Sequence, residues 1–238
     1  MDLALFKTLD SANIKDEFVI RVEELILTEK IVAGDRLPPE RELASHYGVS
    51  RPLIHEGILV LENRGLVTLR PRHGVIVNNY REQATLDMLL SLLKGSGQKL
   101  SPELTEDLEH FRIHIEKDIV SLICRGAGGA KKELKKLRHI NQKMAKGKSA
   151  SELAEFDFQF HLQLALLSGN ALYALLYNTM KPAHMDLLTR FYETSKTRNQ
   201  VVRFHEMLIS ALQDEDEKTA EALIGKGDSY SGYNEEDS

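Results

Sequence analysis

The chain has 238 residues, 42% of them hydrophobic and 28% charged, with 31 Lys and Arg against 36 Asp and Glu. This composition is that of a folded globular protein, and it excludes a disordered chain and a generally basic, histone-like coat protein. A single cysteine, Cys124, excludes an intramolecular disulfide and a cysteine-rich metal cluster. The apolar runs are too short to span a membrane and the first residues lack a secretory pattern, so we expect a cytoplasmic protein.

The first 79 residues predict three helices and a hairpin. Acidic residues in the first turn and apolar residues at helical spacing indicate the first helix. Ser50 is a good N-cap for the third helix, which is expected to end at Gly65. Two β-prone runs then flank a basic tip that contains Gly74, where glycine permits a tight turn. The predicted elements are helices over 16–31, 39–47 and 50–64 and strands over 66–69 and 75–77.

From Tyr80 onward the chain shows only helical patterns, which are broken where glycines cluster. Short connections between helices predict an antiparallel bundle. The expected fold is mainly α, with a winged helix-turn-helix domain over 1–79 and a helical domain over 80–238. The seven expected helices of the second domain lie near 84–94, 103–125, 130–145, 151–167, 171–192, 198–213 and 217–225.

The order of elements in the first domain is typical of a DNA-binding winged helix-turn-helix. In that arrangement the third helix enters the major groove, and the hairpin tip reaches a neighbouring groove or phosphates. The segment 64–74 contains Arg64, Arg70 and Arg72 and no acidic residue. The alternative is that these arginines form an ordinary solvated face. Because one short recognition helix covers only a half-site, we expect a homodimer that reads a pseudo-palindromic operator.

Four segments of this domain resemble the GntR-family DNA-binding domain over residues 15–79. They are RLPPERELA (36–44), YGVSR (47–51), LENRGLV (61–67) and RPRHGVIV (70–77). At the position of His55 most members have arginine, so the resemblance implies a contact that is weaker and pH-sensitive. The resemblance and the motif order together assign DNA contacts to Arg41, Ser50, Arg51, His55, Arg70, Arg72, His73 and Gly74.

The second domain carries a candidate metal site. Asp157 and His161 are four residues apart, so they project from the same face of one helix. His205 lies on a later helix, and Arg112 and His114 lie on an earlier one. A carboxylate and imidazoles that converge inside a bundle can hold a divalent metal. The alternative is that these histidines are hydrogen-bonded core or surface residues.

This domain also resembles the FadR branch of GntR regulators, whose helical domain senses a ligand and dimerises. The segments are VNNY (77–80), EFD (155–157), SGNALY (168–173) and NTMK (178–181). Many members bind a metal through Asp-x-x-x-His and two later histidines; Asp157, His161 and His205 match, but the fourth position is Gly227. The implied zinc, nickel or manganese site is therefore incomplete.

The same resemblance implies an effector. Members that bind long-chain fatty acyl-CoA also have glycine at the position of Gly227, which favours that ligand, whereas the retained His161 speaks against it. Arg112 matches an arginine that faces the effector; its alternative role is a surface salt bridge with Glu109 or Glu116. The predicted effector-binding residues are Arg112, Asp157, His161, Lys181 and His205.

The sequence therefore predicts a transcription regulator whose operator affinity is controlled by a ligand in the bundle, long-chain acyl-CoA first. The alternative effector is a small carboxylate such as lactate or pyruvate, sensed with a metal. A metal-dependent hydrolase is a distant rival, because no nucleophile elbow, phosphate loop or His-Glu-x-x-His motif accompanies the histidines. A bundle that only binds other proteins is a further rival. The operator, the regulated genes and the sign of regulation are not encoded in any motif.

Overall fold

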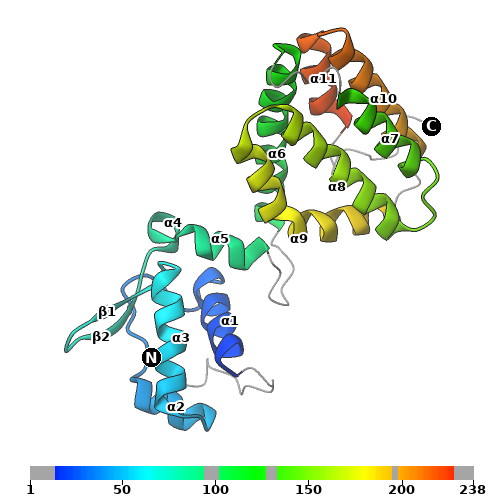
Figure 1. The fold of residues 1–238 in the computed structure, drawn as a ribbon. Helices are drawn as coiled ribbons and strands as arrows, with labels where there is room; N and C mark the ends of the chain where they lie inside the picture. The colour runs from blue at the N-terminus through cyan, green and yellow to red at the C-terminus, as the bar shows by residue number, and fades with distance from the viewer. Residues whose placement is uncertain (1–13, 94–101, 127–132, 195–197, 228–238) are drawn as a thin grey trace. The chain divides into compact units, whose positions relative to one another are not determined.

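The computed structural model describes residues 14–93, 102–126, 133–194 and 198–227, and it divides the chain into two compact units with their boundary between Leu92 and Leu93 (Figure 1). The elements around the first core are α1 (Ile14–Leu27), α2 (Glu40–Tyr47), α3 (Arg51–Asn63), β1 (Val67–Arg70), β2 (Gly74–Val77), α4 (Tyr80–Gln83) and α5 (Leu86–Leu93). The elements of the second unit are α6 (Pro102–Cys124), α7 (Leu134–Met144), α8 (Ala150–Leu167), α9 (Ala171–Thr194), α10 (Arg198–Gln213) and α11 (Glu217–Gly227).

The first unit is built on the crossing of α1 and α3. The core at this crossing contains Phe18 and Val22 of α1 and Ile54 and Ile58 of α3, all fully buried. Gly57 lets the two helices approach, because a Cβ atom there would lie 2.5 Å from the Phe18 ring. This close packing fixes α3 firmly against the rest of the unit.

Helix α1 ends at Leu27, four residues before the predicted end at 31. Glu29 adopts a positive φ of 55°, and the amides of Lys30 and Ile31 both donate to the carbonyl of Leu25. The turn folds Ile31 back into the core, where it is 1% exposed. The apolar periodicity therefore identified a core residue correctly but extended the helix too far.

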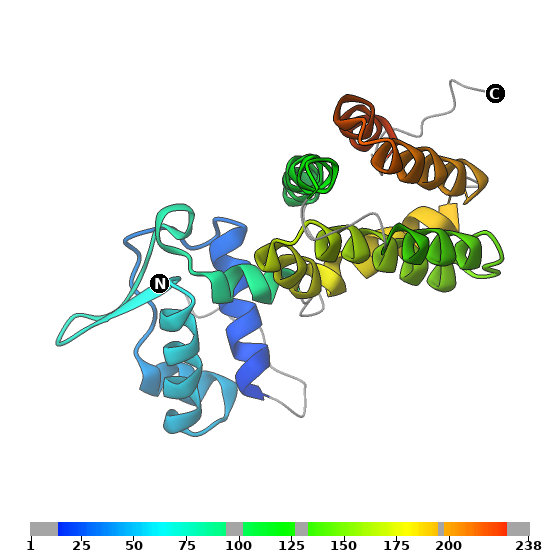
Figure 2. The same cartoon turned by 45° about the horizontal axis from the view of Figure 1, so that its top comes forward.

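The strands β1 and β2 form the predicted antiparallel hairpin, with register from Val67↔Val77 to Arg70↔Gly74. The hairpin extends away from the helices of its own unit (Figures 1 and 2). At its tip, Arg72 and Gly74 have φ values of 63° and 86°. Glycine at 74 is favoured because side chains rarely adopt this left-handed conformation. The predicted wing is therefore present.

Helix α5 packs with the first unit, although the sequence analysis placed residues 80–92 in the second domain. Its Met88 belongs to the first core and is 2% exposed. Ser91 Oγ donates to the buried carboxylate of Glu23 on α1 over 3.4 Å. The helix is rich in leucine and buries one face on the core of the first unit.

The short helix α4 was not predicted. Its last residue, Gln83, lies against Gly65, just after the C-terminal end of α3. A Cβ atom at Gly65 would lie 1.9 Å from the carbonyl oxygen of Gln83, so only glycine permits this approach. The amide of Thr85 then donates to the carbonyl of Arg64 over 3.1 Å. These contacts bind the segment after the wing to the end of the candidate recognition helix.

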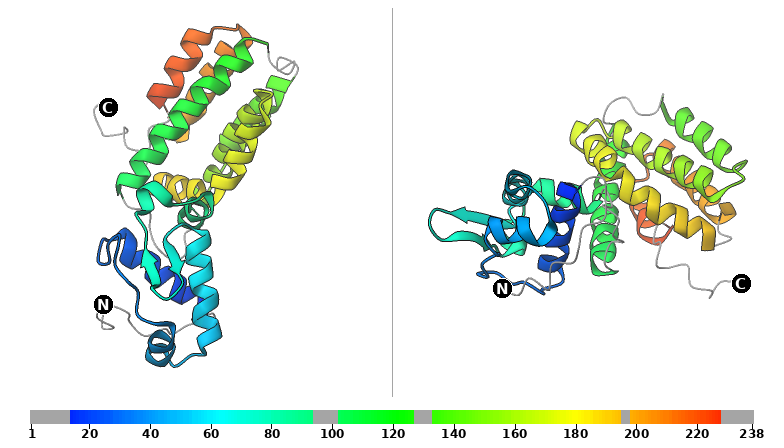
Figure 3. Two further views of the ribbon diagram at one scale, coloured as in Figure 1. Left: turned by 90° about the vertical axis from the view of Figure 1, so that its left-hand side faces the viewer. Right: turned by 90° about the horizontal axis from the view of Figure 1, so that it is seen from below.

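Among the described residues, the second unit contains six helices, and the fold class of a winged helix-turn-helix followed by a helical bundle is confirmed. Helix α8 packs against α7 and α9, and α6 lies alongside α11 (Figure 3). Helix α10 packs against α7 and α11. The predicted start of the 130–145 helix lies outside the described residues. Within the described part of the chain, no helix has the length and apolarity needed to cross a membrane.

Candidate functional site

The helix-turn-helix begins with α2. Its C-cap residue, Gly48, adopts a left-handed backbone conformation. Ser50 is the N-cap residue of α3, as predicted, with extended backbone angles of −72° and 145°. Its side chain makes no capping hydrogen bond and is exposed. Pro52 in the first turn removes an amide that has no helical partner. The start of α3 therefore presents polar groups to solvent, as a recognition helix must.

Glu40 at the start of α2 holds two of the predicted DNA-contacting residues of α3. Its Oε2 accepts a hydrogen bond from Arg51 Nε at 2.9 Å, and its Oε1 lies 2.8 Å from His55 Nδ1. Burial of the Glu40 carboxylate would raise its pKa, but the hydrogen bonds from His55 and Arg51 outweigh burial and lower the pKa. Sequence analysis missed this role of Glu40, because it depends on how α2 packs on α3.

The wing places its predicted residues in solvent. Arg70, Arg72 and His73 are exposed at the hairpin tip, and Arg41 is exposed on α2. The guanidinium of Arg36 lies against Gly74, with its Nε 2.8 Å from where a glycine-replacing Cβ would sit. Arg36 belongs to the first GntR-like segment, yet the sequence analysis did not count it among the DNA contacts. It adds a cation beside the wing.

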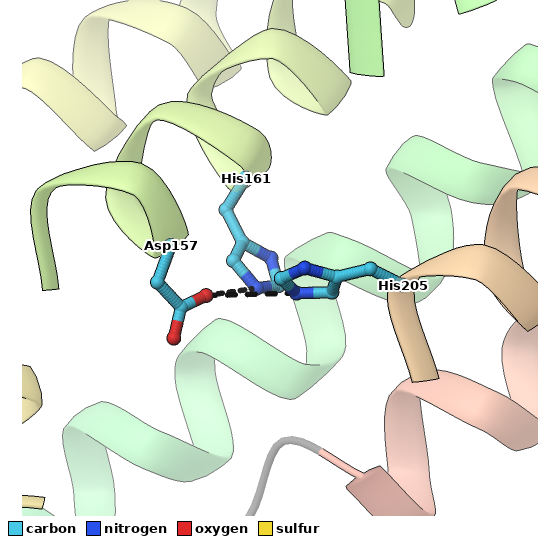
Figure 4. Close-up of side chains that lie close together, drawn as sticks. All are labelled: Asp157, His161 and His205. Carbon is cyan, nitrogen blue, oxygen red and sulfur yellow. Dashed lines mark ion pairs between the residues drawn. The ribbon is translucent and has the colours of Figure 1, made fainter. Parts of the chain in front are cut away.

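In the bundle, the structure brings Asp157, His161 and His205 together (Figure 4). Asp157 Oδ1 lies 3.2 Å from His161 Nε2 and 3.6 Å from His205 Nε2. The three side chains are buried, with exposed fractions of 3%, 3% and 1%. Asp157 and His161 come from α8 and His205 comes from α10, as the sequence predicted.

Four further side chains surround these three, and none was predicted as part of the site. Tyr192 of α9 donates to Asp157 Oδ2 over 2.6 Å. Glu116 of α6 lies 3.1 Å from His161 Nδ1 and accepts a hydrogen bond from Tyr177 of α9. Asn141 of α7 meets His205 Nδ1 at 3.3 Å. Five helices therefore contribute to one buried polar cluster.

The contacts of Asn141 determine which nitrogen of His205 carries the proton. Asn141 Nδ2 donates to the carbonyl of Val202 over 2.9 Å, so its Oδ1 accepts from His205 Nδ1. Burial lowers the pKa of His205 to about 3, which keeps the ring neutral. The Nε2 of a neutral ring with a protonated Nδ1 is a lone-pair acceptor. It faces another acceptor, Asp157 Oδ1, and a cation between them would relieve the repulsion.

The surroundings of the two buried carboxylates lower their pKa values. Burial would raise the pKa of Asp157, but His161, His205 and Tyr192 together outweigh it. Burial would likewise raise the pKa of Glu116, but His161, Arg112 and Tyr177 together outweigh it. The groups that stabilise the two buried carboxylates are thus Arg112 at Glu116 and the neighbouring histidines. A divalent metal bound to Asp157 and His161 would displace a proton from the imidazole.

The three donor atoms fit a divalent metal. Ligands that lie about 2.0–2.1 Å from a tetrahedral zinc are about 3.3 Å apart. The measured separations of 3.2 and 3.6 Å around Asp157 Oδ1 are close to that value. His205 has its Nδ1 hydrogen-bonded to Asn141, and the Nδ1 of His161 lies 3.1 Å from Glu116 Oε1; an oxygen beside this nitrogen is the usual support of a metal-binding histidine. Gly227 has no side chain to supply a fourth ligand.

The remaining predicted residues lie outside the cluster or have a different role in it. Arg112 Nη1 lies 3.6 Å from Glu116 Oε1, and this pair is buried in the cluster rather than on the surface. Lys181 pairs with Glu155 at 3.1 Å and has 42% of its side chain exposed, so it lies outside the cluster. His114 is exposed, and its Nδ1 contacts the carbonyl of His110.

A winged helix-turn-helix joined to an all-helical unit is the architecture of a DNA-binding transcription regulator. The chain belongs to the bacterial regulatory proteins of the gntR family that carry a FadR C-terminal domain: the first family model matches residues 15–77 and the second matches 78–234. The resemblance seen in the sequence is thereby confirmed.

Two similar proteins are named fatty acid metabolism regulator protein. The one from Shewanella pealeana is 26% identical over 215 residues, which cover 90% of this chain and 85% of the relative. The one from Proteus mirabilis is 24% identical over 212 residues, which cover 89% and 85%. The solved structure of Streptococcus agalactiae GntR shares 24% identity and a TM-score of 0.44 over 88% of this chain and 94% of that chain.

Proposed function

We propose that the protein is a homodimeric regulator whose affinity for its operator is lowered by long-chain fatty acyl-CoA bound in the helical unit. The observation that carries the proposal is the FadR C-terminal domain match over 78–234, together with relatives that are named for fatty acid metabolism and matched over about nine-tenths of this chain. The ligand can lower the affinity for DNA by no more than the ratio of its own affinities for the DNA-releasing and the DNA-binding conformations of the protein.

The DNA side of this proposal rests on the exposed residues of the first unit. Arg51 and His55 at the start of α3 would face base edges, with Arg41 and Ser50 beside them. Arg70, Arg72, His73 and Gly74 of the wing would contact phosphates or a neighbouring groove. A dimer would place two such units on the two halves of a pseudo-palindrome.

In this proposal, the acyl chain of the effector lies among the apolar side chains of the bundle. The cluster around Asp157 and His161 would then form part of the wall. Lys181 is the better candidate for the phosphates of the CoA head group, because its side chain is partly exposed whereas that of Arg112 is buried against Glu116. Lys181 also lies 4.9 Å over the Phe158 ring, so it stands where apolar core meets solvent.

A second effector, a small carboxylate such as lactate or pyruvate bound with zinc, nickel or manganese, is favoured by one observation. Asp157, His161 and His205 present three donor atoms within 4.8 Å of one another. If a metal is bound there, these residues would hold it, and it would supply an electrophilic centre for the effector carboxylate. Water or that carboxylate would fill the position for which Gly227 offers no ligand.

A gel-shift titration with purified full-length protein and a selected operator separates the two effectors. We expect oleoyl-CoA to release the operator at micromolar concentration and free CoA to have no effect. Release by lactate or pyruvate only when a metal is present, with no response to oleoyl-CoA, would reject acyl-CoA in favour of the second effector.

Three variants sharpen the same titration. Lys181→Ala should weaken the response to oleoyl-CoA, whereas Lys136→Ala, which removes a comparable surface pair with Glu133, should not. Asp157→Asn should abolish a response that needs a metal. If Lys136→Ala and Lys181→Ala weaken the response equally, the assignment of Lys181 to the head group is incorrect.

A further inference from the structure

The carboxylate of Glu40 restrains two neighbouring side chains of the recognition helix at once. One oxygen accepts from Arg51 Nε at 2.9 Å and the other contacts His55 Nδ1 at 2.8 Å. The Glu40 side chain is 18% exposed, whereas those of Arg51 and His55 are 71% and 46% exposed. The Glu40 carboxylate is therefore shielded by α2 and α3, whereas the outer parts of the Arg51 and His55 side chains remain accessible to a ligand.

This contact decides which edge of the His55 ring is available. A carboxylate is only an acceptor, so Nδ1 of His55 donates to Glu40, and Nε2 is left on the other side of the ring. In the neutral ring Nε2 is an acceptor. In the protonated ring the same nitrogen carries a hydrogen and becomes a donor. Protonation thus turns the outward-facing Nε2 of His55 from an acceptor into a donor, while the side chain keeps its position.

We propose that Glu40 is a positioning residue for His55, and that protonation of His55 switches the base it prefers in the operator. In the major groove, guanine offers the acceptors O6 and N7, whereas adenine and cytosine offer amino groups as donors. The protonated ring would therefore select guanine, and the neutral ring adenine or cytosine. The proposal rests on the assignment of the start of α3 to the DNA interface.

The charged groups near His55 come from α1, α2 and α3. Glu40 of α2 contacts His55 directly, and Arg51, one turn earlier on α3, shares the same carboxylate. From α1, Lys15 lies 3.9 Å from Glu56, the residue after His55. Strand β1 meets α3 at its far end, away from His55, where Glu62 accepts from the amide of Leu69. The direct contact with Glu40 is the closest of these, so Glu40 is the group that orients the His55 ring.

The test is selection of sequences from a random duplex library by the purified full-length protein at about pH 5.5 and about pH 8, which bracket the charge change of histidine. We expect one symmetric pair of operator positions to change from guanine at the lower pH to adenine or cytosine at the higher pH. Because one net hydrogen bond contributes about 0.5–1.5 kcal/mol, the relative preference at that position should change roughly threefold to tenfold.

Three variants assign the change to His55. His55→Arg should select guanine at both pH values, since arginine is always a donor. Glu40→Gln should weaken the pH-dependent change, because an amide can also donate and no longer fixes Nδ1 as the protonated nitrogen, and its melting temperature reports whether the unit remains folded. His46→Gln is the matched control, because it removes an exposed histidine of the same unit that is not among the assigned DNA contacts, and it should keep the pH-dependent change.

Several outcomes overturn the proposal. It fails if the wild type selects the same bases at both pH values, or if affinity merely rises uniformly at lower pH, which would indicate a phosphate contact. It also fails if His55→Arg keeps the change or His46→Gln abolishes it. A protein that selects no sequence at either pH would instead contradict DNA binding itself.

Discussion

Addition of a divalent metal is expected to stabilise the helical unit, and Asp157→Asn is expected to abolish this stabilisation. The carboxylate supplies the one anionic donor, Oδ1, which lies 3.2 and 3.6 Å from the two histidine nitrogens. The amide in the variant keeps the shape of the side chain and can still accept the hydrogen bond from Tyr192. It removes the charge that would attract the ion.

The size of the effect follows from linkage. A metal that binds only the folded state, at a free concentration about 100 times its dissociation constant, adds about 2.7 kcal/mol to the free energy of unfolding. The second unit runs from Leu93 to Ser238. For a domain of this size, 1 kcal/mol corresponds to about 2–4 °C, so the melting temperature should rise by about 5–11 °C.

The assay is thermal melting of protein treated with a chelator and then titrated with zinc, nickel or manganese, with metal content measured in parallel. Asp186→Asn is the matched control, because this aspartate is an exposed carboxylate of α9 that pairs with Arg190. A wild-type melting temperature that ignores all three metals would refute the reasoning. Equal rises in the wild type and in Asp157→Asn would place the bound metal elsewhere.

Three further predictions concern the first unit. Gly57→Ala should lower the free energy of unfolding by up to about 2 kcal/mol in urea denaturation, because overpacking against Phe18 costs about 1–3 kcal/mol and helix propensity returns only about 1 kcal/mol. Arg51→Ala should weaken specific DNA binding by about 1–3 kcal/mol and relax base preference, whereas Arg72→Ala should weaken all sequences evenly and reduce the salt dependence in gel shifts. Burial raises the pKa of Glu23 above its usual value, despite the opposing contacts of Arg64 and Ser91. The stability that this group contributes is therefore fully present below its usual pKa and is lost as pH rises through the folded pKa. In urea denaturation at increasing pH, Glu23→Gln should gain stability relative to the wild type as pH rises above the usual pKa of glutamate.

Contacts between residues on one face of the same helix were easier to predict from the sequence than contacts between residues of different helices. The spacing of Asp157 and His161 placed both on one face, and the structure has them in contact. The spacing of Arg112 and Glu116 also identified their pair, but not that it is buried. Asn141 gave no signal, because its role depends on α7 packing against α10. Contacts of this kind follow from tertiary packing and not from local periodicity.

The same limit applies to the fold. The leucine-rich pattern of residues 86–93 predicted a helix correctly, but the pattern does not say which apolar surface covers it. In the structure that surface belongs to the first unit, where Met88 is buried. Helix α4, with four residues, is too short to show a periodicity. At Ile31 the apolar pattern continued through a turn, so the residue was predicted in the core but the backbone was predicted as helix.

The packing of α5 has a consequence for protein engineering. A chimera that joins this DNA-binding unit to a different sensor is expected to be soluble only when the junction follows residue 92. A junction at residue 79 would uncover the apolar surface that Met88 covers, and it would leave the Glu23 carboxylate without its contact to Ser91. Modules exchanged in this way should therefore include the helix after the wing as part of the DNA-reading module.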